Sequence, residues 1–107
     1  MARETLQGTL DLLILKTLAR GSEHGYGISC AILIASQNQL RVVEGSLYPA
    51  LRRMECGGLI RAEWKSSENN RRARYYHLTT RGRKYLAAVE ERWHQHTAAV
   101  SAFLDFA

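Results

Sequence analysis

Three arginines stand close together at one point of the sequence, and their placement is the first feature that could carry chemistry. The stretch SSENNRRARYYHLT, residues 66–79, puts Arg71, Arg72 and Arg74 directly after a polar turn. The residues on either side of this turn alternate between apolar and polar, which predicts a β-hairpin with the arginines near its tip. Arginine at such a tip adds nothing to a hydrophobic core. The position therefore indicates a partner outside the chain that carries negative charge.

The net charge is concentrated in the same part of the chain. The whole sequence of 107 residues carries a formal charge of +5, but residues 61–84 alone hold eight basic and two acidic side chains. Residues 1–60 are nearly balanced, and residues 85–107 are slightly acidic. One cationic face that meets a polyanion explains this pattern, and a basic surface exposed only to solvent is the alternative.

The composition indicates one globular domain. An apolar fraction of 46% and a charged fraction of 23% are ordinary for a folded protein. No apolar run is long enough for a membrane span, which needs roughly 18 residues, and Asp11 and Lys16 interrupt the apolar N-terminal stretch where a signal peptide would lie. Cys30 and Cys56 are far apart and form no CxxC pair. We expect a cytoplasmic protein with buried thiols and not a disulfide-bonded scaffold.

The hydrophobic periodicity predicts four helices and a hairpin. Apolar residues at helical spacing predict helices over 5–19 and 26–36, a third helix within 44–58, and a last helix of about 25 residues that begins at Thr79 or Thr80. Period-two alternation predicts strands over 59–65 and 72–79, joined by a turn at Asn69-Asn70. A very short strand is also expected at 40–43, and a glycine-broken turn at 20–27.

The third helix has one apolar and one polar face. Leu47, Leu51 and Met54 recur at helical spacing and should face inward, and the single proline should lie near the start of the helix. The outward face then presents five side chains: Ser46, Tyr48, Pro49, Arg52 and Arg53. Arginine can donate two hydrogen bonds to guanine, whereas serine and tyrosine more often contact phosphate.

The order of these elements predicts a mainly α (α+β) fold, a winged helix-turn-helix domain over 1–79 followed by a dimerisation helix over 80–107. A last helix of roughly 38 Å is longer than so small a domain can cover, so we expect a homodimer. The first helix also has a second apolar face. The expected dimer contacts are Leu12, Leu15, Leu86, Val89, Trp93, Val100 and Leu104.

Several alternatives stay open at this point. Tyr48 can pack on the hairpin or contact DNA, and Arg53 can pair with Glu44 or Glu55 instead. The hairpin arginines, with Lys65 beside them, can bind phosphates or enter a minor groove. A winged-helix module that binds a protein, or a non-specific nucleic-acid-binding protein, would have a similar sequence. Salt-dependent affinity and base selectivity distinguish these classes.

Nothing in the sequence indicates an enzyme, a metal site or a cofactor. His94 and His96 are two residues apart on a helix and point in different directions, and no nucleophile stands beside a base in a known motif. We expect no catalytic residues, no metal ligands and no cofactor.

Three long motifs resemble the PadR family of bacterial transcription regulators, in its compact form with one C-terminal helix. They are LQGTLDLLILKTLARGSEHGYGI, EGSLYPALRRMECGGLIRAEW and SENNRRARYYHLTTRGRKYL, and the resemblance covers residues 6–93. The resemblance implies a dimeric repressor that binds a partly palindromic operator, often near its own gene or a transporter gene. It also implies DNA contacts by Tyr26, Ser46, Tyr48, Pro49, Arg52, Arg71, Arg72 and Arg74.

Trp93 lies on the last helix, where it could stack on a ligand. Some compact members of the family look like sensors in which a planar aromatic molecule enters the dimer interface. Trp93 and its counterpart in a second copy could then bind such a small aromatic effector. Ordinary packing between two helices is the alternative role for this tryptophan.

Overall fold

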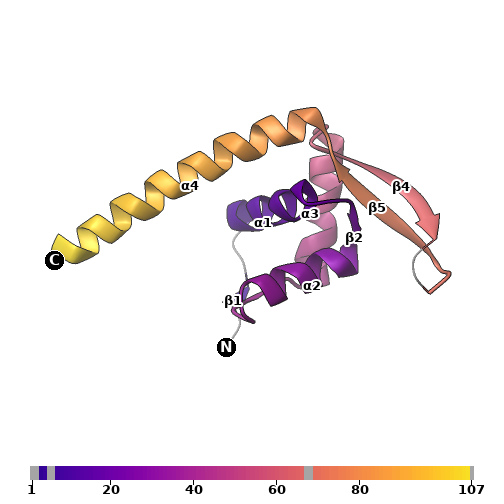
Figure 1. Cartoon of the computed structure of the whole chain (residues 1–107), viewed down its shortest axis with the longest axis horizontal. Coiled ribbons are helices and arrows are strands. Elements are labelled where there is room, and N and C mark those ends of the chain that lie inside the picture. Colours follow the sequence, from indigo (N-terminus) through magenta and orange to yellow (C-terminus); the bar gives the residue numbers. More distant parts are fainter. Residues whose placement is uncertain (1–2, 5–6, 67–68, 107) are drawn as a thin grey trace.

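The computed structural model describes residues 3–4, 7–66 and 69–106, so Thr5, Leu6 and part of the hairpin turn lie outside the described residues. The chain forms a small helical body from which a hairpin and a long helix project in different directions (Figure 1). Its overall extents are 55 × 32 × 22 Å. The helices and strands in chain order are β1 (Arg3–Glu4), α1 (Gln7–Ala19), β2 (Glu23–His24), α2 (Gly25–Ala35), β3 (Leu40–Arg41), α3 (Glu44–Cys56), β4 (Ile60–Ser66), β5 (Arg72–Leu78) and α4 (Thr80–Phe106).

The core is built where the first three helices meet the base of the hairpin. The inward stripe predicted for α3 is confirmed, since Leu47, Leu51 and Met54 are buried. Most of the other core side chains are Leu10, Ile14 and Leu18 of α1, Ile28 and Ile32 of α2, and Ile60 and Tyr76 of the hairpin. Burying a leucine or isoleucine fully contributes about 1.5–3 kcal/mol, so this cluster is the main source of stability.

Two residues expected at a dimer contact belong to this core instead. Leu15 is fully buried and Leu86 is 6% exposed within the single chain. Their side chains are covered by the chain itself, which leaves them little or no surface for a second copy. The assignment of Leu15 and Leu86 to dimerisation is therefore wrong. Helix α1 has apolar residues on two faces, and the rest of the chain buries residues on both of them.

The hairpin is the predicted one, with a third strand that the sequence did not reveal. In the three-stranded sheet the order is β2-β5-β4, and both pairings are antiparallel. Trp64 lies opposite Arg74, and Ile60 lies opposite Leu78. The stretch expected to be only a turn includes β2, whose Glu23 and His24 pair with Tyr76 and Tyr75. This pairing fixes the start of α2 beside the hairpin.

The turn residues have the backbone angles that their residue types favour, whereas the proline lies deeper in its helix than expected. Asn70 in the hairpin turn and Gln37 and Asn38 after α2 all have left-handed backbone angles. Pro49 is the sixth residue of α3, not a residue of its first turn. Its missing N–H therefore removes a hydrogen bond inside the helix, the one to the Gly45 carbonyl one turn earlier.

Helix α4 begins in the core and ends outside it. Gly82 packs so closely on the Leu59 carbonyl that a Cβ atom at this position would collide with it. Farther along, the Lys16 ammonium of α1 donates to the Glu90 carboxylate at 3.0 and 3.2 Å. Every residue from Glu91 to Phe106 is exposed, and this part forms the arm seen in Figure 1. No helix in the described residues is long and apolar enough to cross a membrane.

Candidate nucleic-acid interface

Residues from three elements line one concave surface. The start of α2, the outer side of α3 and the hairpin enclose a hollow of about 430 Å³. Its walls are formed by His24, Gly25, Tyr26, Tyr48, Trp64, Asn69, Arg71, Arg72, Ala73, Arg74 and Tyr76. Of the residues predicted to bind DNA, the structure brings together Tyr26, Tyr48, Arg71, Arg72 and Arg74 around this hollow. A second hollow of about 450 Å³ lies beside it on α3 and is lined by Tyr48, Pro49, Arg52, Arg53 and Cys56.

The start of α2 is held in place by a histidine cap. The Nδ1 atom of His24 accepts a hydrogen bond from the Gly27 N–H at 3.0 Å, as expected for an N-cap side chain. The His24 ring also meets the Tyr75 ring edge-on, with 5.2 Å between the ring centres. Tyr26 is 73% exposed at the second position of the helix, close to the positive end of the helix dipole.

The phenol of Tyr26 is suited to donate a hydrogen bond. A side-chain hydrogen bond with Cys30 raises the pKa of Tyr26 above its ordinary value. A tyrosine hydroxyl is protonated at neutral pH even at its ordinary pKa, so Tyr26 can donate to an acceptor such as a phosphate oxygen.

Tyr48 packs on the start of α2. A Cβ atom on Gly25 would come within 2.6 Å of the Tyr48 hydroxyl and 2.9 Å of its ring carbons. Gly25 is buried, and the absence of a side chain there leaves room for the ring. Tyr48 remains 45% exposed, so the same residue joins α3 to α2 and presents a face to the outside.

The two arginines of α3 lie in different surroundings. Arg52 is exposed, and within the described residues no carboxylate lies within salt-bridge distance of it. Arg53 donates to the Asp11 carboxylate of α1 through both terminal nitrogens, at 2.8 and 3.0 Å, and this bond raises its pKa. The partner of Arg53 is thus Asp11, not Glu44 or Glu55. Arg53 is already engaged in holding α3 against α1.

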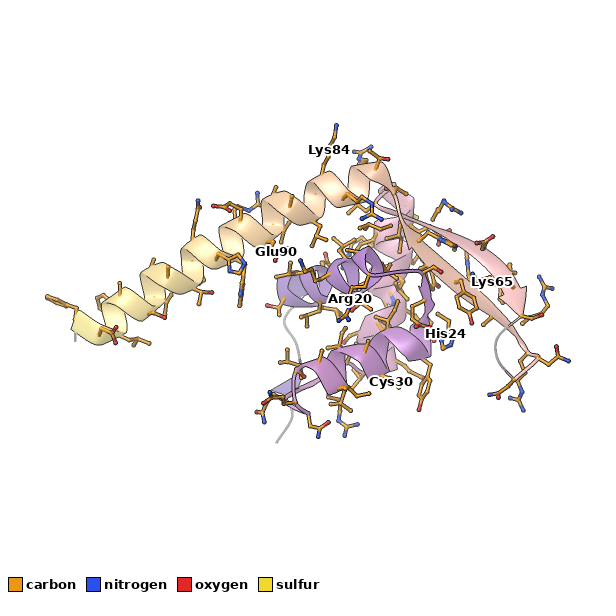
Figure 2. All side chains as sticks on the ribbon, in the orientation of Figure 1. Arg20, His24, Cys30, Lys65, Lys84 and Glu90 are labelled. Carbon is orange, nitrogen blue, oxygen red and sulfur yellow. The ribbon has the colours of Figure 1, made fainter. Side chains whose placement is uncertain are left out.

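We call the hairpin (residues 60–78) the wing. Several of its basic side chains contact neighbouring aromatic or acidic side chains. Lys65 lies 4.5 Å above the Tyr75 ring and projects from the strand (Figure 2). The Arg72 guanidinium stacks on the indole of Trp64 at 5.3 Å, and Arg74 donates to Glu55 at 2.7 Å. These contacts orient Arg72 and Lys65 without neutralising their charge.

Residues 14–88 match the model of the Transcriptional regulator PadR-like family. The chain belongs to this family. The match covers well over half of the 107 residues and confirms the resemblance found in the sequence. The family and the fold are those of transcription regulators, a class that generally has no catalytic activity, and PadR regulators bind DNA.

Solved structures agree with the family in fold. A transcriptional regulator from Clostridium thermocellum is 32% identical and has a TM-score of 0.82, with 91% of this chain and 94% of that one covered. A protein from Streptococcus mutans has a TM-score of 0.86 at 26% identity, with 98% and 94% covered. A PadR family regulator from Clostridium difficile is 30% identical with a TM-score of 0.75, over 89% and 97% of the two chains. The winged helix with a long C-terminal helix is therefore shared with PadR regulators.

Two residues of this PadR surface were missed in the sequence. Trp64 belongs to the apolar series of its strand, yet it is 58% exposed, because the strand extends beyond the core. His24 caps α2, a role that was not predicted from the sequence. Its position directly before a GYG turn and an apolar helix was the available signal. In the described residues no group of three potential metal ligands lies close together.

A second surface lies between α4 and α1, and it is largely apolar. A hollow of about 370 Å³ is lined by Gly8, Thr9, Leu12, Val89, Arg92, Trp93 and His96. Farther along α4, Val100, Phe103 and Leu104 are 43–67% exposed. Of the predicted dimer residues, Leu12, Val89, Trp93, Val100 and Leu104 thus keep surface available outside the chain's own core.

Proposed function

We propose that this protein is a bacterial repressor that acts in the cytoplasm as a homodimer and binds a partly palindromic operator. The observation that carries the proposal is the concave surface on which α2, α3 and the wing present tyrosines and arginines together. A surface of this composition suits a phosphate backbone, because arginine and tyrosine both donate to phosphate oxygens. The membership of a DNA-binding regulator family supports the same conclusion.

Each element has its own role in this proposal. Arg52, exposed on α3 and not engaged by a carboxylate among the described residues, contacts guanine in the major groove. Ser46, Tyr48 and Tyr26 donate to phosphates and fix the orientation of α3. The wing carries Lys65, Arg71, Arg72 and Arg74 along the duplex, where they bind phosphates or enter the minor groove.

The dimer is proposed to form through α4 and α1. The exposed apolar side chains on the outer half of α4 are costly to leave in water, and a second copy would cover them. Leu12, Val89, Trp93, Val100 and Leu104 are the proposed contact residues. A two-fold arrangement would hold two recognition helices roughly 34–36 Å apart, one turn of the double helix.

Selection from random duplex DNA tests the specificity and the symmetry together. A specific dimer should enrich two inverted half-sites at a fixed spacing, and its affinity should fall steeply with salt concentration. On the selected site Arg52→Ala should cost about 1–3 kcal/mol at one base position, whereas Arg72→Ala should weaken binding to all sequences alike. Equal losses on every sequence for both variants would favour a non-specific nucleic-acid-binding protein. Binding that does not depend on salt would favour a protein-interaction module.

An aromatic effector is proposed at Trp93. The hollow between α1 and α4 is lined by the Trp93 indole, Arg92 and His96, among others. In the proposed dimer this hollow would adjoin the second copy. A planar molecule stacked there would change the spacing of the two recognition helices. Titration with planar cationic dyes should alter tryptophan emission in the wild type, and Trp93→Ala should abolish the change. Emission that no dye alters in either protein would exclude this role.

A further inference from the structure

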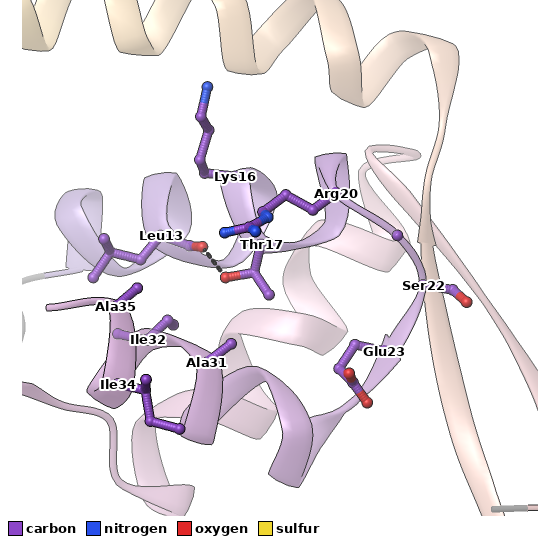
Figure 3. A pocket seen from close by; sticks show the side chains of 11 residues that line it. Leu13, Lys16, Thr17, Arg20, Ser22, Glu23, Ala31, Ile32, Ile34 and Ala35 are labelled. Carbon is purple, nitrogen blue, oxygen red and sulfur yellow. Dashed lines mark hydrogen bonds between the residues drawn. The ribbon is translucent and has the colours of Figure 1, made fainter.

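A groove between α1 and α2 lies apart from both surfaces described above. It measures about 700 Å³ and is shown in Figure 3. Its walls are Leu13, Lys16, Thr17, Arg20, Gly21, Ser22, Glu23, Ala31, Ile32, Ile34 and Ala35. None of the residues proposed to contact DNA or a second copy belongs to this set. The volume lies within the range of about 300–1,000 Å³ that is typical of small-molecule sites.

The apolar part of the groove is entirely aliphatic. Leu13 comes from α1, and Ala31, Ile32, Ile34 and Ala35 come from α2. Ile34 is 72% exposed at the edge, which is unusual for an isoleucine in a folded domain. Because no aromatic side chain lines the groove, nothing there stacks on a planar ring. A flexible hydrocarbon chain fits this lining best.

Three charged side chains stand at the rim, and two of them already have partners. Lys16 is paired with Glu90, and Glu23 accepts from the His24 backbone N–H at 3.1 Å and lies 3.5 Å from the His24 Nε2. Arg20 is exposed, and no ion pair of its guanidinium occurs among the residues that the structure describes. Arg20 is therefore the cation at this rim that no carboxylate among the described residues neutralises.

We propose that the groove binds an aliphatic carboxylate, with the hydrocarbon chain between α1 and α2 and the carboxylate on Arg20. The guanidinium can donate two parallel hydrogen bonds to a carboxylate, which is the strongest form of this interaction at a protein surface. The hydroxyl of Thr17 already donates to the Leu13 carbonyl at 2.8 Å, as Figure 3 shows, so it has no proton left for the carboxylate, and Arg20 is the donor at this end of the groove.

Lys16 connects this site to α4. Its side chain points toward α4 in Figure 3, where its ammonium binds Glu90. A carboxylate at the rim of the groove competes with Glu90 for the same ammonium. Removing the charge of Glu90 should therefore release Lys16 and strengthen ligand binding, whereas removing the charge of Arg20 should weaken it.

The test uses octanoate as the ligand and methyl NMR of the full chain as the measurement. Saturable shifts are expected at the methyl groups of Leu13, Ala31, Ile34 and Ala35. Arg20→Gln should weaken binding about tenfold or more, and Ala35→Phe, which fills the groove, should abolish it. Glu90→Gln should strengthen binding about two- to fivefold. Arg83→Gln removes one exposed arginine from α4 and should change nothing.

The results that would overturn the proposal are equally specific. Shifts that do not saturate, or that appear mainly outside the groove, exclude the site. Octylamine that binds as tightly as octanoate, or an Arg20→Gln variant with wild-type affinity, excludes the carboxylate. An unchanged affinity in Glu90→Gln excludes the role of Lys16. No DNA is present in this assay, so its outcome is independent of the proposed repressor function.

Discussion

The guanidinium of Arg53 on α3 and the carboxylate of Asp11 on α1 form a two-bond ion pair between residues 42 positions apart in the sequence. Asp11 keeps only 14% of its side chain exposed, whereas Arg53 keeps 44%. The pair fixes α3 against α1 from the outside of the core.

Breaking this pair should lower stability more than it lowers DNA affinity. We expect Arg53→Ala to reduce the free energy of unfolding by roughly 1 kcal/mol, because the pair is bidentate but still partly in solvent. Urea denaturation of Arg53→Ala, Asp11→Ala and the double variant gives the coupling between the two residues. On a selected operator Arg53→Ala should lose less affinity than Arg52→Ala. The opposite order would make Arg53 a DNA contact.

Gly82→Ala should destabilise the fold. The new methyl group meets the Leu59 carbonyl and comes within 2.7 Å of a Leu78 methyl carbon, so α4 must shift at a cost of about 1–3 kcal/mol. Gly45→Ala is the matched control, since no atom lies within 4 Å of a Cβ atom there. This control should be neutral or more stable by up to about 1 kcal/mol. Thermal unfolding of both variants measures the difference, and equal behaviour would contradict the packing of α4.

Gly25→Ala should weaken DNA binding through Tyr48. The methyl group occupies the place of the Tyr48 hydroxyl and ring edge, which displaces the ring from α2. If the effect passes through Tyr48, the double variant Gly25→Ala/Tyr48→Ala should bind no more weakly than Tyr48→Ala, within about 0.5 kcal/mol. Fluorescence anisotropy on a selected operator measures all three. Additive losses would show that Gly25 acts independently of the tyrosine.

The Lys16–Glu90 pair should make stability depend on acid pH. The hydrogen bond from Lys16 lowers the pKa of Glu90 below its ordinary value of 4.5, and His94 contributes in the same direction. The contribution of the carboxylate is therefore present above pH 4.5 and disappears as the pH falls through the lowered pKa. Glu90→Gln should be less stable than the wild type at pH 7, and the difference should shrink as the pH falls below 4.5.

Denaturation at a single protein concentration and two pH values measures this effect. Glu91→Gln is the control, because within the described residues Glu91 contacts only the amide of Gln95. This variant should show a much smaller difference at both pH values. A Glu90→Gln difference that persists unchanged at pH 3 would show that the loss is not electrostatic.

Trp64 should report DNA binding at the wing. The chain has two tryptophans, so Trp93→Phe leaves Trp64 as the single emitter. Its ring is half exposed and stacked with Arg72, so a phosphate that attracts Arg72 should change its emission. The emission of Arg72→Ala in the same background should respond less. An emission that DNA does not alter in either protein would place Trp64 outside the interface.

The sequence was informative where the pattern is local and repetitive. The inward stripe of α3 and the two strands of the hairpin follow from helical and strand periods, and both are confirmed. Strand β2 could not be found in this way, because two residues have no period and their pairing depends on where β5 lies. Leu15 was misplaced for a related reason: an apolar residue on a second helix face can meet a partner chain or the protein's own core.

In the candidate site too, local patterns could be predicted from the sequence and long-range contacts could not. The outward position of Arg52 follows from the helical period of α3 alone. The engagement of Arg53 by Asp11 and of Arg74 by Glu55 depends on contacts between residues that are distant in the sequence, so counting the charges could not reveal it. The contact between Tyr48 and Gly25 likewise requires α2 to lie beside α3, which only the packing of the helices determines.

The exposed outer half of α4 links assembly of the proposed dimer to the concentration of the protein in the cell. From Glu91 onward the described residues of this helix are exposed, and an isolated helical segment of this length is only marginally stable in water. In the proposed dimer, folding of this segment and pairing of two copies are one event. At low copy number the amount of assembled regulator then rises with the square of the subunit concentration. Operator occupancy would therefore respond steeply to synthesis and dilution, even with no effector present.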